Sequence, residues 1–331
     1  MPDGCDPVLH LMGTVGLAEF LAFAHDFADL TVPGTGALGG ATPMDLAEAW
    51  RDAADVYQSI NTAEAYPEGL PGLFPFTDAM HAHCEAFLAK PHVQREFDQV
   101  PVALAMVPLA HLIVATQRLN GTTVSGHGAA LGAGAVADLA LVQHCLPLEP
   151  PAHSLQLIEQ HDGSATFASD QPEIAFLGAH LAHRATGFID ATVTQRTVPG
   201  VRGHTEQTLA LALGFPGNVL NVIRYQNRLF LNNGYHRALA LLKRGVTHVP
   251  AVIQVCRHWD DVGLVGSAAL FNQRALFAER ERPPLLKDFV DPRLCMSFAV
   301  PRRRAYLRIR YAIETGHLRD TVPGAVVTRR E

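Results

Sequence analysis

Residues 219–253 read VLNVIRYQNRLFLNNGYHRALALLKRGVTHVPAVI, and most of what can be inferred about the fold starts from this stretch. Two apolar segments are separated by only two polar residues, Gln226 and Asn227, a spacing that predicts a tight β-hairpin. Apolar residues then recur at helical spacing until Gly245, a residue typical of a helix end. The expected elements are a strand at Val219–Tyr225, a strand at Arg228–Asn232, a helix at Tyr235–Arg244 and a strand at Val249–Val255.

The junction at Asn232–Arg237 is the most informative point, because a strand ends there and a helix begins at once. The first turn of a helix exposes backbone N–H groups at the positive end of the helix dipole, and Gly234 permits a close approach. Such a helix start is suited to binding an anion. His236 and Arg237 stand in this turn, where cations are disfavoured by roughly 0.3–1 kcal/mol each. A bound phosphate would explain them. The alternative is that Arg237 pairs with a carboxylate elsewhere and that His236 is a half-buried histidine with satisfied hydrogen bonds.

The order of motifs between His204 and Cys256 resembles the ParB/sulfiredoxin superfamily. In that superfamily a Gly-x-[His/Arg]-Arg box at the start of a helix holds the phosphates of ATP or CTP. The resemblance implies this role for Gly234, His236 and Arg237, within a ligand-binding segment that also includes Asn232, Asn233 and Tyr235. The residues that carry the resemblance are Glu206–Gly214, Val219–Arg224, Leu229–Arg237, Ala240, Gly245 and Val249–Ile253.

Departures from the family pattern narrow the implied activity. Sulfiredoxins have their catalytic cysteine where this chain has Tyr235, so sulfinic-acid reduction by that route is not expected. ParB partitioning proteins continue into a helix-turn-helix DNA reader, and Trp259–Gly266 gives no such signature. The His-Arg ending of the box is most similar to members that phosphorylate free serine with a nucleotide. His236 is therefore also a candidate catalytic residue.

A phosphotransferase needs a carboxylate that can accept the proton of the substrate hydroxyl. If Val102–Val107 is the first strand of the family fold, the segment after it offers Gln117 and Arg118 as ligand contacts, but it holds no Asp or Glu before Arg118. Asp170 and Glu173 are the best remaining candidates for a general base. The alternative is that both are acids of a surface loop.

Composition excludes several other classes of protein. The chain of 331 residues has a formal net charge of −6, which argues against a general or sequence-specific nucleic-acid binder. Five scattered cysteines without a CxxC motif indicate reduced thiols in a cytoplasmic protein. Neither a signal peptide nor an apolar stretch of about 20 residues is visible, so no membrane association is expected.

The predicted organisation is an α+β fold in three parts. These are a helical N-terminal region at 1–100, a ParB/sulfiredoxin-like nucleotide-binding core at 101–260 with an insertion at about 121–203, and a C-terminal helix–strand extension at 261–331. Within them we expect a helix capped by Thr42, a turn at Asn120–Gly128 before a helix at Ala129–Val142, and a helix at His204–Leu213. A terminal strand around Arg302–Tyr311 places alternate arginines beside Tyr306 on one face, either solvated or able to hold an anion.

The leading expectation is a nucleotide-dependent enzyme that transfers a phosphoryl group from ATP, or a related nucleoside triphosphate or diphosphate, to a small hydroxyl-bearing substrate, with Mg²⁺ screening the phosphate charge. The alternative is a nucleotide-gated switch protein without turnover. A third possibility is a relative that has kept the fold but binds no nucleotide.

Overall fold

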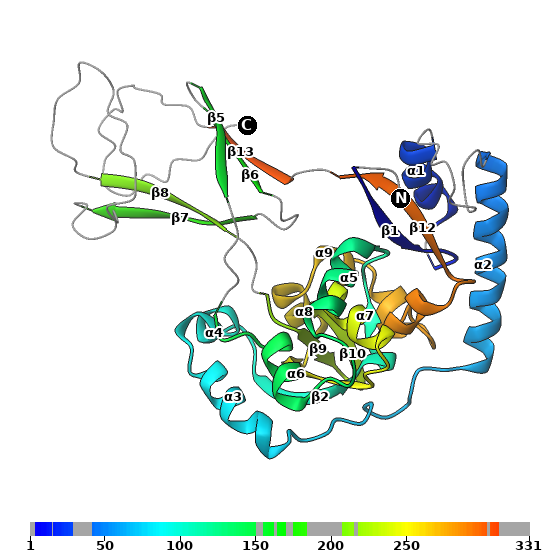
Figure 1. Ribbon diagram of the computed structural model, residues 1–331, viewed down its shortest axis with the longest axis horizontal. Coiled ribbons are helices and arrows are strands. Elements are labelled where there is room, and N and C mark those ends of the chain that lie inside the picture. The colour runs from blue at the N-terminus through cyan, green and yellow to red at the C-terminus, as the bar shows by residue number, and fades with distance from the viewer. Residues whose placement is uncertain are drawn as a thin grey trace, which may run out of the picture. The chain divides into compact units, whose positions relative to one another are not determined.

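The computed structural model describes residues 4–14, 16–28, 42–149, 155–161, 164–169, 175–183, 207–214, 218–302 and 305–310, and it has an α+β fold (Figure 1). The chain forms two compact units. The first comprises Met1–Pro151 and Gly217–Arg302, and the second comprises Ala152–Pro216 and Arg303–Glu331. The first unit thus draws on all three predicted parts of the chain, and it holds every described candidate site residue.

A five-stranded mixed sheet forms the centre of the first unit. Its strand order is β2-β11-β9-β10-β3, in which β11 is parallel to β9 and β10 is parallel to β3, while the other two pairs are antiparallel. The predicted hairpin is confirmed, and Gln226 in its turn has a φ of 53°. The strands are β2 (Val102–Pro108), β3 (Ile113–Val114), β9 (Asn221–Tyr225), β10 (Arg228–Asn233) and β11 (His248–Cys256).

Alternating side chains of these strands pack into two separate cores, one on each face of the sheet. Val222, Leu229 and Leu231 enter the larger core, whereas Ile223 and Phe230 enter the smaller one. The larger core is covered by α3 (Asp78–Leu88), α4 (Pro91–Glu96), α5 (Gly121–Ala130), α6 (Asp138–Cys145) and α7 (Tyr235–Lys243). The smaller core is covered by α8 (Trp259–Val265), α9 (Ala268–Phe271) and a π-helix at Ala275–Glu279.

A second sheet of the first unit, with the order β12-β1-β4, was not predicted. It joins β1 (Cys5–Leu11), β4 (Arg118–Asn120) and β12 (Cys295–Pro301) in antiparallel pairs. The N-terminal region is therefore not entirely helical, because β1 finds its partners far along the chain. Helices α1 (Leu17–Ala28) and α2 (Pro43–Ala63) follow β1, and two 3-10 helices lie at Leu109–His111 and Leu286–Val290.

Two helix starts show where the sequence-based prediction of a helix cap was right and where it was wrong. The cap at Thr42 is confirmed, since its hydroxyl accepts from the Asp45 N–H at 3.2 Å while the Asp45 carboxylate accepts from the Thr42 N–H. The predicted turn at Asn120–Gly128 is wrong. Asn120 caps a helix instead, its side-chain oxygen accepting from the Thr123 N–H at 2.9 Å, and this helix (α5) ends at Ala130.

The second unit contains two small antiparallel sheets among its described residues. One has the order β13-β6-β5, from β5 (Gln156–His161), β6 (Ser164–Ser169) and β13 (Ala305–Arg310), and the other pairs β7 (Ala175–His183) with β8 (Gln207–Gly214). The helix predicted at His204–Leu213 is therefore wrong. Leu209, Leu211 and Leu213 alternate with smaller residues, which is the period of a strand, and β7 supplies the hydrogen bonds.

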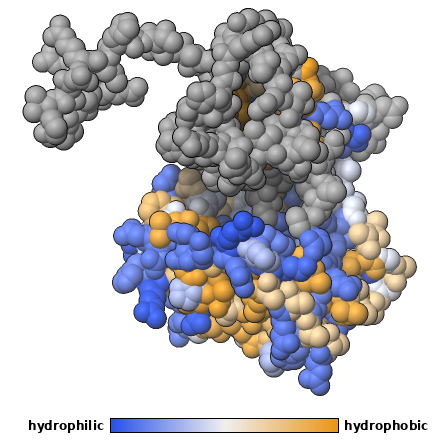
Figure 2. Space-filling model, turned by 90° about the vertical axis from the view of Figure 1, so that its left-hand side faces the viewer, coloured by the Kyte–Doolittle hydropathy of each residue, from blue (hydrophilic) through white to orange (hydrophobic). Residues whose placement is uncertain are grey.

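Three observations bear on the partners that the protein could bind. Figure 2 shows hydrophobic residues interspersed among hydrophilic ones on the face that it draws. The alternation predicted for the terminal strand is observed in β13, where Tyr306, Arg308 and Arg310 are exposed and the residues between them are half-buried. None of the helices in the described part of the chain combines the length and the apolar character that crossing a membrane requires.

Candidate functional site

The start of α7 depends on Gly234. This residue has a φ of 88°, in the left-handed region that favours glycine, and a β-carbon there would lie 3.2 Å from the Leu220 Cα atom. The Asn233 side-chain oxygen accepts from the Gly234 N–H at 2.6 Å, and the first helical bond runs from the Ala238 N–H to the Gly234 carbonyl at 2.8 Å. The predicted strand–glycine–helix junction is thus present, and the first-turn N–H groups lie at the positive end of α7.

Arg237 is held by the fold, in a way that the sequence did not indicate. Its side chain is 3% exposed, and it donates to the Cys145 carbonyl at 3.1 Å and to the Asn218 carbonyl at 3.2 Å. A further N–H donates to the Asn218 side-chain oxygen at 2.5 Å. Cys145 is the last residue of α6, so the guanidinium stands at the negative end of a neighbouring helix dipole. Two backbone carbonyl oxygens and the Asn218 side chain thus accept hydrogen bonds from this cation.

His236 has the half-buried position that the alternative interpretation anticipated. Its Nε2 accepts a hydrogen bond from the Asn120 backbone N–H at 3.1 Å, and burial lowers the pKa of the ring to about 4. Because a backbone N–H can only donate, Nε2 carries no proton, and the neutral ring has its proton on Nδ1. His236 therefore presents an N–H donor at Nδ1 and is not a cation at neutral pH.

The remaining predicted ligand residues of the β10–α7 junction serve packing roles. Asn232 donates to the Asn221 side-chain oxygen and to the Val265 carbonyl, each at 2.8 Å, which ties β10 to β9 and to the end of α8. Tyr235 is partly buried against the larger core. Burial raises the pKa of its hydroxyl, and a hydrogen bond with the Ala115 backbone partly offsets this rise. Neither side chain is presented as an acid or base at neutral pH.

The segment 117–120 lies against α7, and Gln117 and Arg118 make contacts to other parts of the first unit. The Gln117 carbonyl accepts from the Leu11 N–H at 2.8 Å, and the Arg118 guanidinium lies 4.8 Å from the centre of the Phe23 ring. The link to α7 is made by the backbone of Asn120, through its bond to His236. Asp170 and Glu173, the candidate bases, lie outside the described residues, in the sequence between β6 and β7 of the second unit.

Two histidines that the sequence did not single out as site residues lie next to the predicted box. His127 on α5 and His144 on α6 have ring centres 5.2 Å apart, with their planes nearly perpendicular. Burial is the main cause that lowers the pKa of each ring to about 4, and the positive charge of Arg237 adds to the effect in both. Figure 1 shows α5 beside α7. A tertiary contact between three helices creates this cluster, so no local motif could reveal it.

Metal ligands do not gather in the described part of the chain, where no group of three or more His, Cys, Asp or Glu residues is placed to hold an ion. A magnesium ion usually binds through substrate phosphates together with one or two carboxylates. The Mg²⁺ expected from the sequence would therefore depend mainly on the phosphates of the nucleotide.

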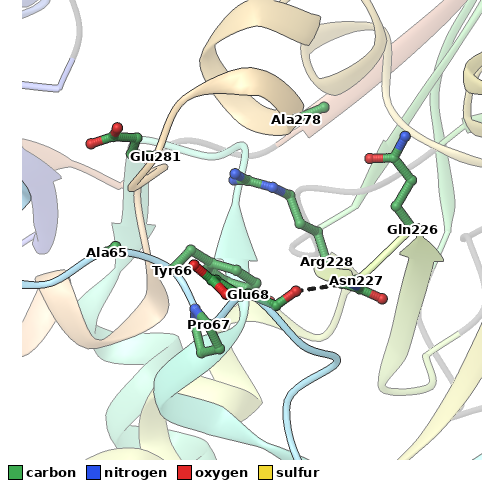
Figure 3. A pocket seen from close by; sticks show the side chains of 9 residues that line it. All are labelled: Ala65, Tyr66, Pro67, Glu68, Gln226, Asn227, Arg228, Ala278 and Glu281. Atoms are coloured by element: carbon green, nitrogen blue, oxygen red, sulfur yellow. Dashed lines mark hydrogen bonds between the residues drawn. The ribbon is translucent and has the colours of Figure 1, made fainter.

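A cavity of about 390 Å³ lies elsewhere in the first unit, beside the β9–β10 turn (Figure 3). Arg228 extends into it over the ring of Tyr66, at 5.1 Å, and donates to the carbonyls of Phe277 and Arg280 at 3.3 and 2.6 Å. These bonds fix the π-helical segment to the hairpin. None of the predicted site residues lines this cavity, so we treat it as separate from the α7 site.

The cysteines are poorly suited to redox chemistry. Burial raises the pKa of Cys256 to about 11, and it also raises the pKa of Cys145 to about 12 and that of Cys295 to about 11. We expect iodoacetamide at neutral pH to label the half-buried Cys5 first, as measured by peptide mass spectrometry, because thiols with raised pKa values react slowly. Rapid labelling of Cys256 in the folded protein would contradict this and would reopen a thiol-based mechanism.

Comparisons with protein-family models, with curated proteins and with solved structures find no match to this chain. The resemblance to the ParB/sulfiredoxin superfamily therefore rests on the sequence motifs alone.

Proposed function

We propose that this chain has a ParB/sulfiredoxin-like core that binds ATP, or a related nucleoside triphosphate or diphosphate, through its phosphates at the start of α7. The reaction proposed is phosphoryl transfer to a small hydroxyl-bearing substrate. The observation that carries the proposal is the left-handed Gly234 between β10 and α7, which begins a helix whose first-turn N–H groups lie beside three neutral histidines.

Each residue of the site would have its own role in binding the phosphates. The first-turn N–H groups of α7 and the Nδ1–H of His236 would donate to phosphate oxygens. Arg237 would contribute positive charge, while its N–H groups donate to Asn218 and to the end of α6. A phosphate-bound Mg²⁺ would neutralise the remaining charge. Asp170 and Glu173 stay the candidates for the general base.

A nucleotide-gated switch is the second candidate function, and one observation favours it. Among the described residues, the charged and titratable groups that shift the pKa values of His127 and His144 are histidines and Arg237, and no carboxylate shifts the pKa of any of the three rings. A phosphotransferase needs a base within hydrogen-bond reach of its substrate, whereas a switch needs only the anion site. Stoichiometric binding without hydrolysis or transfer would select the switch.

We expect Gly234→Ala to weaken binding of Mg-ATP by about tenfold or more, since the added methyl group meets Leu220 and φ is unfavourable for alanine. Isothermal titration calorimetry would measure the affinity, and thermal melting would establish that the variant is folded. Gly245→Ala is the matched control, because Gly245 also has a positive φ, of 79°, but has nothing within 4 Å of its added carbon and lies at the far end of α7.

Two results would contradict the proposal. One is the absence of binding to the parent protein across ATP, CTP, GTP and ADP, each with and without magnesium. The other is equal loss of affinity in both glycine variants, since this would trace the effect to general destabilisation of α7.

A further inference from the structure

Three helices bring imidazole rings together at the α7 site. His127 comes from α5, His144 from α6 and His236 from the first turn of α7, and α5 packs directly against α7. Arg244, near the end of α7, reinforces this packing by donating to the carbonyls of Gly128 and Gly132 at the end of α5. The histidines are thus positioned by the helix packing rather than by a flexible loop.

The ring of His144 has an unsatisfied nitrogen. Its Nε2 is buried and forms no hydrogen bond, although the ring contacts His127 edge to face. A buried polar atom without a partner costs free energy, which a ligand oxygen in hydrogen-bond contact would recover. This atom is an observation independent of the helix start, and it too favours a polar ligand at this place.

The electrostatic surroundings of the histidine pair identify the sign of that ligand. Arg237 and His236 face His127 from α7, and Arg237 also acts on His144. Asp6 lies at the other end of α5, where it accepts from Thr122 and is paired with Arg302. Asp138 begins α6 and accepts from Thr77. Among the described residues, the cation that acts on both rings is therefore the Arg237 guanidinium, which would attract an anion.

We infer that His127, His144 and His236 form a binding site for a tetrahedral oxyanion, and that the anion is bound together with protons that the His127 and His144 imidazoles take from solvent. The inference rests on the proposed function and deepens it, since the ligand would be the phosphate of the nucleotide or of a smaller phosphate-bearing molecule. In the empty site each ring is neutral and offers one N–H donor. A bound dianion reverses the field at the rings and converts His127 and His144 into N–H donors at both nitrogens. His236 donates only through Nδ1, because its Nε2 accepts from the Asn120 N–H.

Sulfate is the probe for the experiment, because it remains a dianion throughout the relevant pH range and its own titration cannot mimic that of the protein. Its affinity would be measured by calorimetry at about pH 7, 6 and 5. We expect the affinity to rise up to about tenfold per pH unit for each proton taken up. Histidine-detected NMR should show the pKa of His144 raised in the presence of sulfate.

His127→Gln and His144→Gln are expected to reduce this pH dependence, and a His81→Gln variant is the control, because His81 is an exposed histidine of α3. A parent affinity that does not depend on pH would overturn the inference, as would an unchanged pH dependence in both glutamine variants.

The same series of measurements with inorganic phosphate and with Mg-ATP separates the two proposals. If sulfate and phosphate bind with a pH dependence that requires the histidines, but ATP does not bind, the oxyanion site is supported and the nucleotide is rejected as its ligand. ATP binding that needs Gly234 but neither histidine rejects the inference alone.

Discussion

Acidification from about pH 6.5 towards pH 4 is expected to destabilise the first unit by several kcal/mol, because one buried and three half-buried histidines are neutral in the native state. His10 is 1% exposed among phenylalanine rings, and burial lowers its pKa to about 4, as it does for His127, His144 and His236. In the unfolded chain these rings titrate near pH 6.5.

The sign follows from proton binding. Between about pH 6.5 and pH 4 the unfolded state binds more protons than the native state, so stability falls as pH falls. Each histidine contributes about 1.4 kcal/mol per pH unit where it is protonated only in the unfolded state, and four contribute up to about 5 kcal/mol per pH unit. The carboxyl groups of Asp6 and Asp291, whose pKa values are lowered by Arg302 and Arg293 respectively, lose their stabilising effect only at lower pH.

Urea unfolding monitored by tryptophan fluorescence would measure this effect. Both tryptophans, Trp50 and Trp259, belong to the first unit, so the signal reports on it alone. The double variant His127→Gln/His144→Gln should show about half the slope of free energy against pH. A free energy of unfolding that stays constant between about pH 6.5 and pH 4.5 would show that these rings are protonated in the native state.

Replacement of Arg237 by alanine should lower the free energy of unfolding by about 2–4 kcal/mol. The variant leaves the carbonyl and the side-chain oxygen of Asn218 without their buried donor, and it removes a cation from the end of α6. Denaturant titration would measure the change. Arg293→Ala is the control, since that arginine is 63% exposed and its ion pair with Asp291 is on the surface, where the loss should be below about 1 kcal/mol.

This result decides how any loss of ligand binding in Arg237→Ala should be interpreted. A destabilised variant that retains affinity, measured below its melting temperature, would assign Arg237 to the architecture of the site. A variant as stable as the parent would contradict the structural role described above, and loss of nucleotide affinity in that stable variant would make Arg237 a direct phosphate ligand.

The parts of the fold that could be predicted are those that a pattern of neighbouring residues in the sequence determines. The β9–β10 hairpin follows from two apolar segments around a two-residue turn, and α7 follows from helical spacing between two glycines. The Thr42 cap is likewise a local motif. At the candidate site, local physics located the helix start and raised the alternative that His236 is half-buried with its bond satisfied.

The missed features depend on contacts between distant residues. β1 is a strand because it pairs with β12 and β4, and β8 is a strand because β7 lies beside it. The partners of Arg237 come from α6 and from Asn218, and the His127–His144 pair requires α5 and α6 to meet. Periodicity carries no information about such pairings, although the alternation of leucines in β8 was a signal for a strand.

The register of β1 has a consequence for the order of events during synthesis. Cys5 lies opposite Pro301, and β1 also pairs with β4, which ends at the Asn120 that bonds to His236. A ribosome must therefore release nearly the whole chain before the N-terminal strand can acquire both neighbours. Until then, β1 can pair only with β4, and the aromatic cluster around His10 lacks Phe298 of β12. Premature termination anywhere before β12 should yield a product that chaperones retain, even when the central sheet is complete.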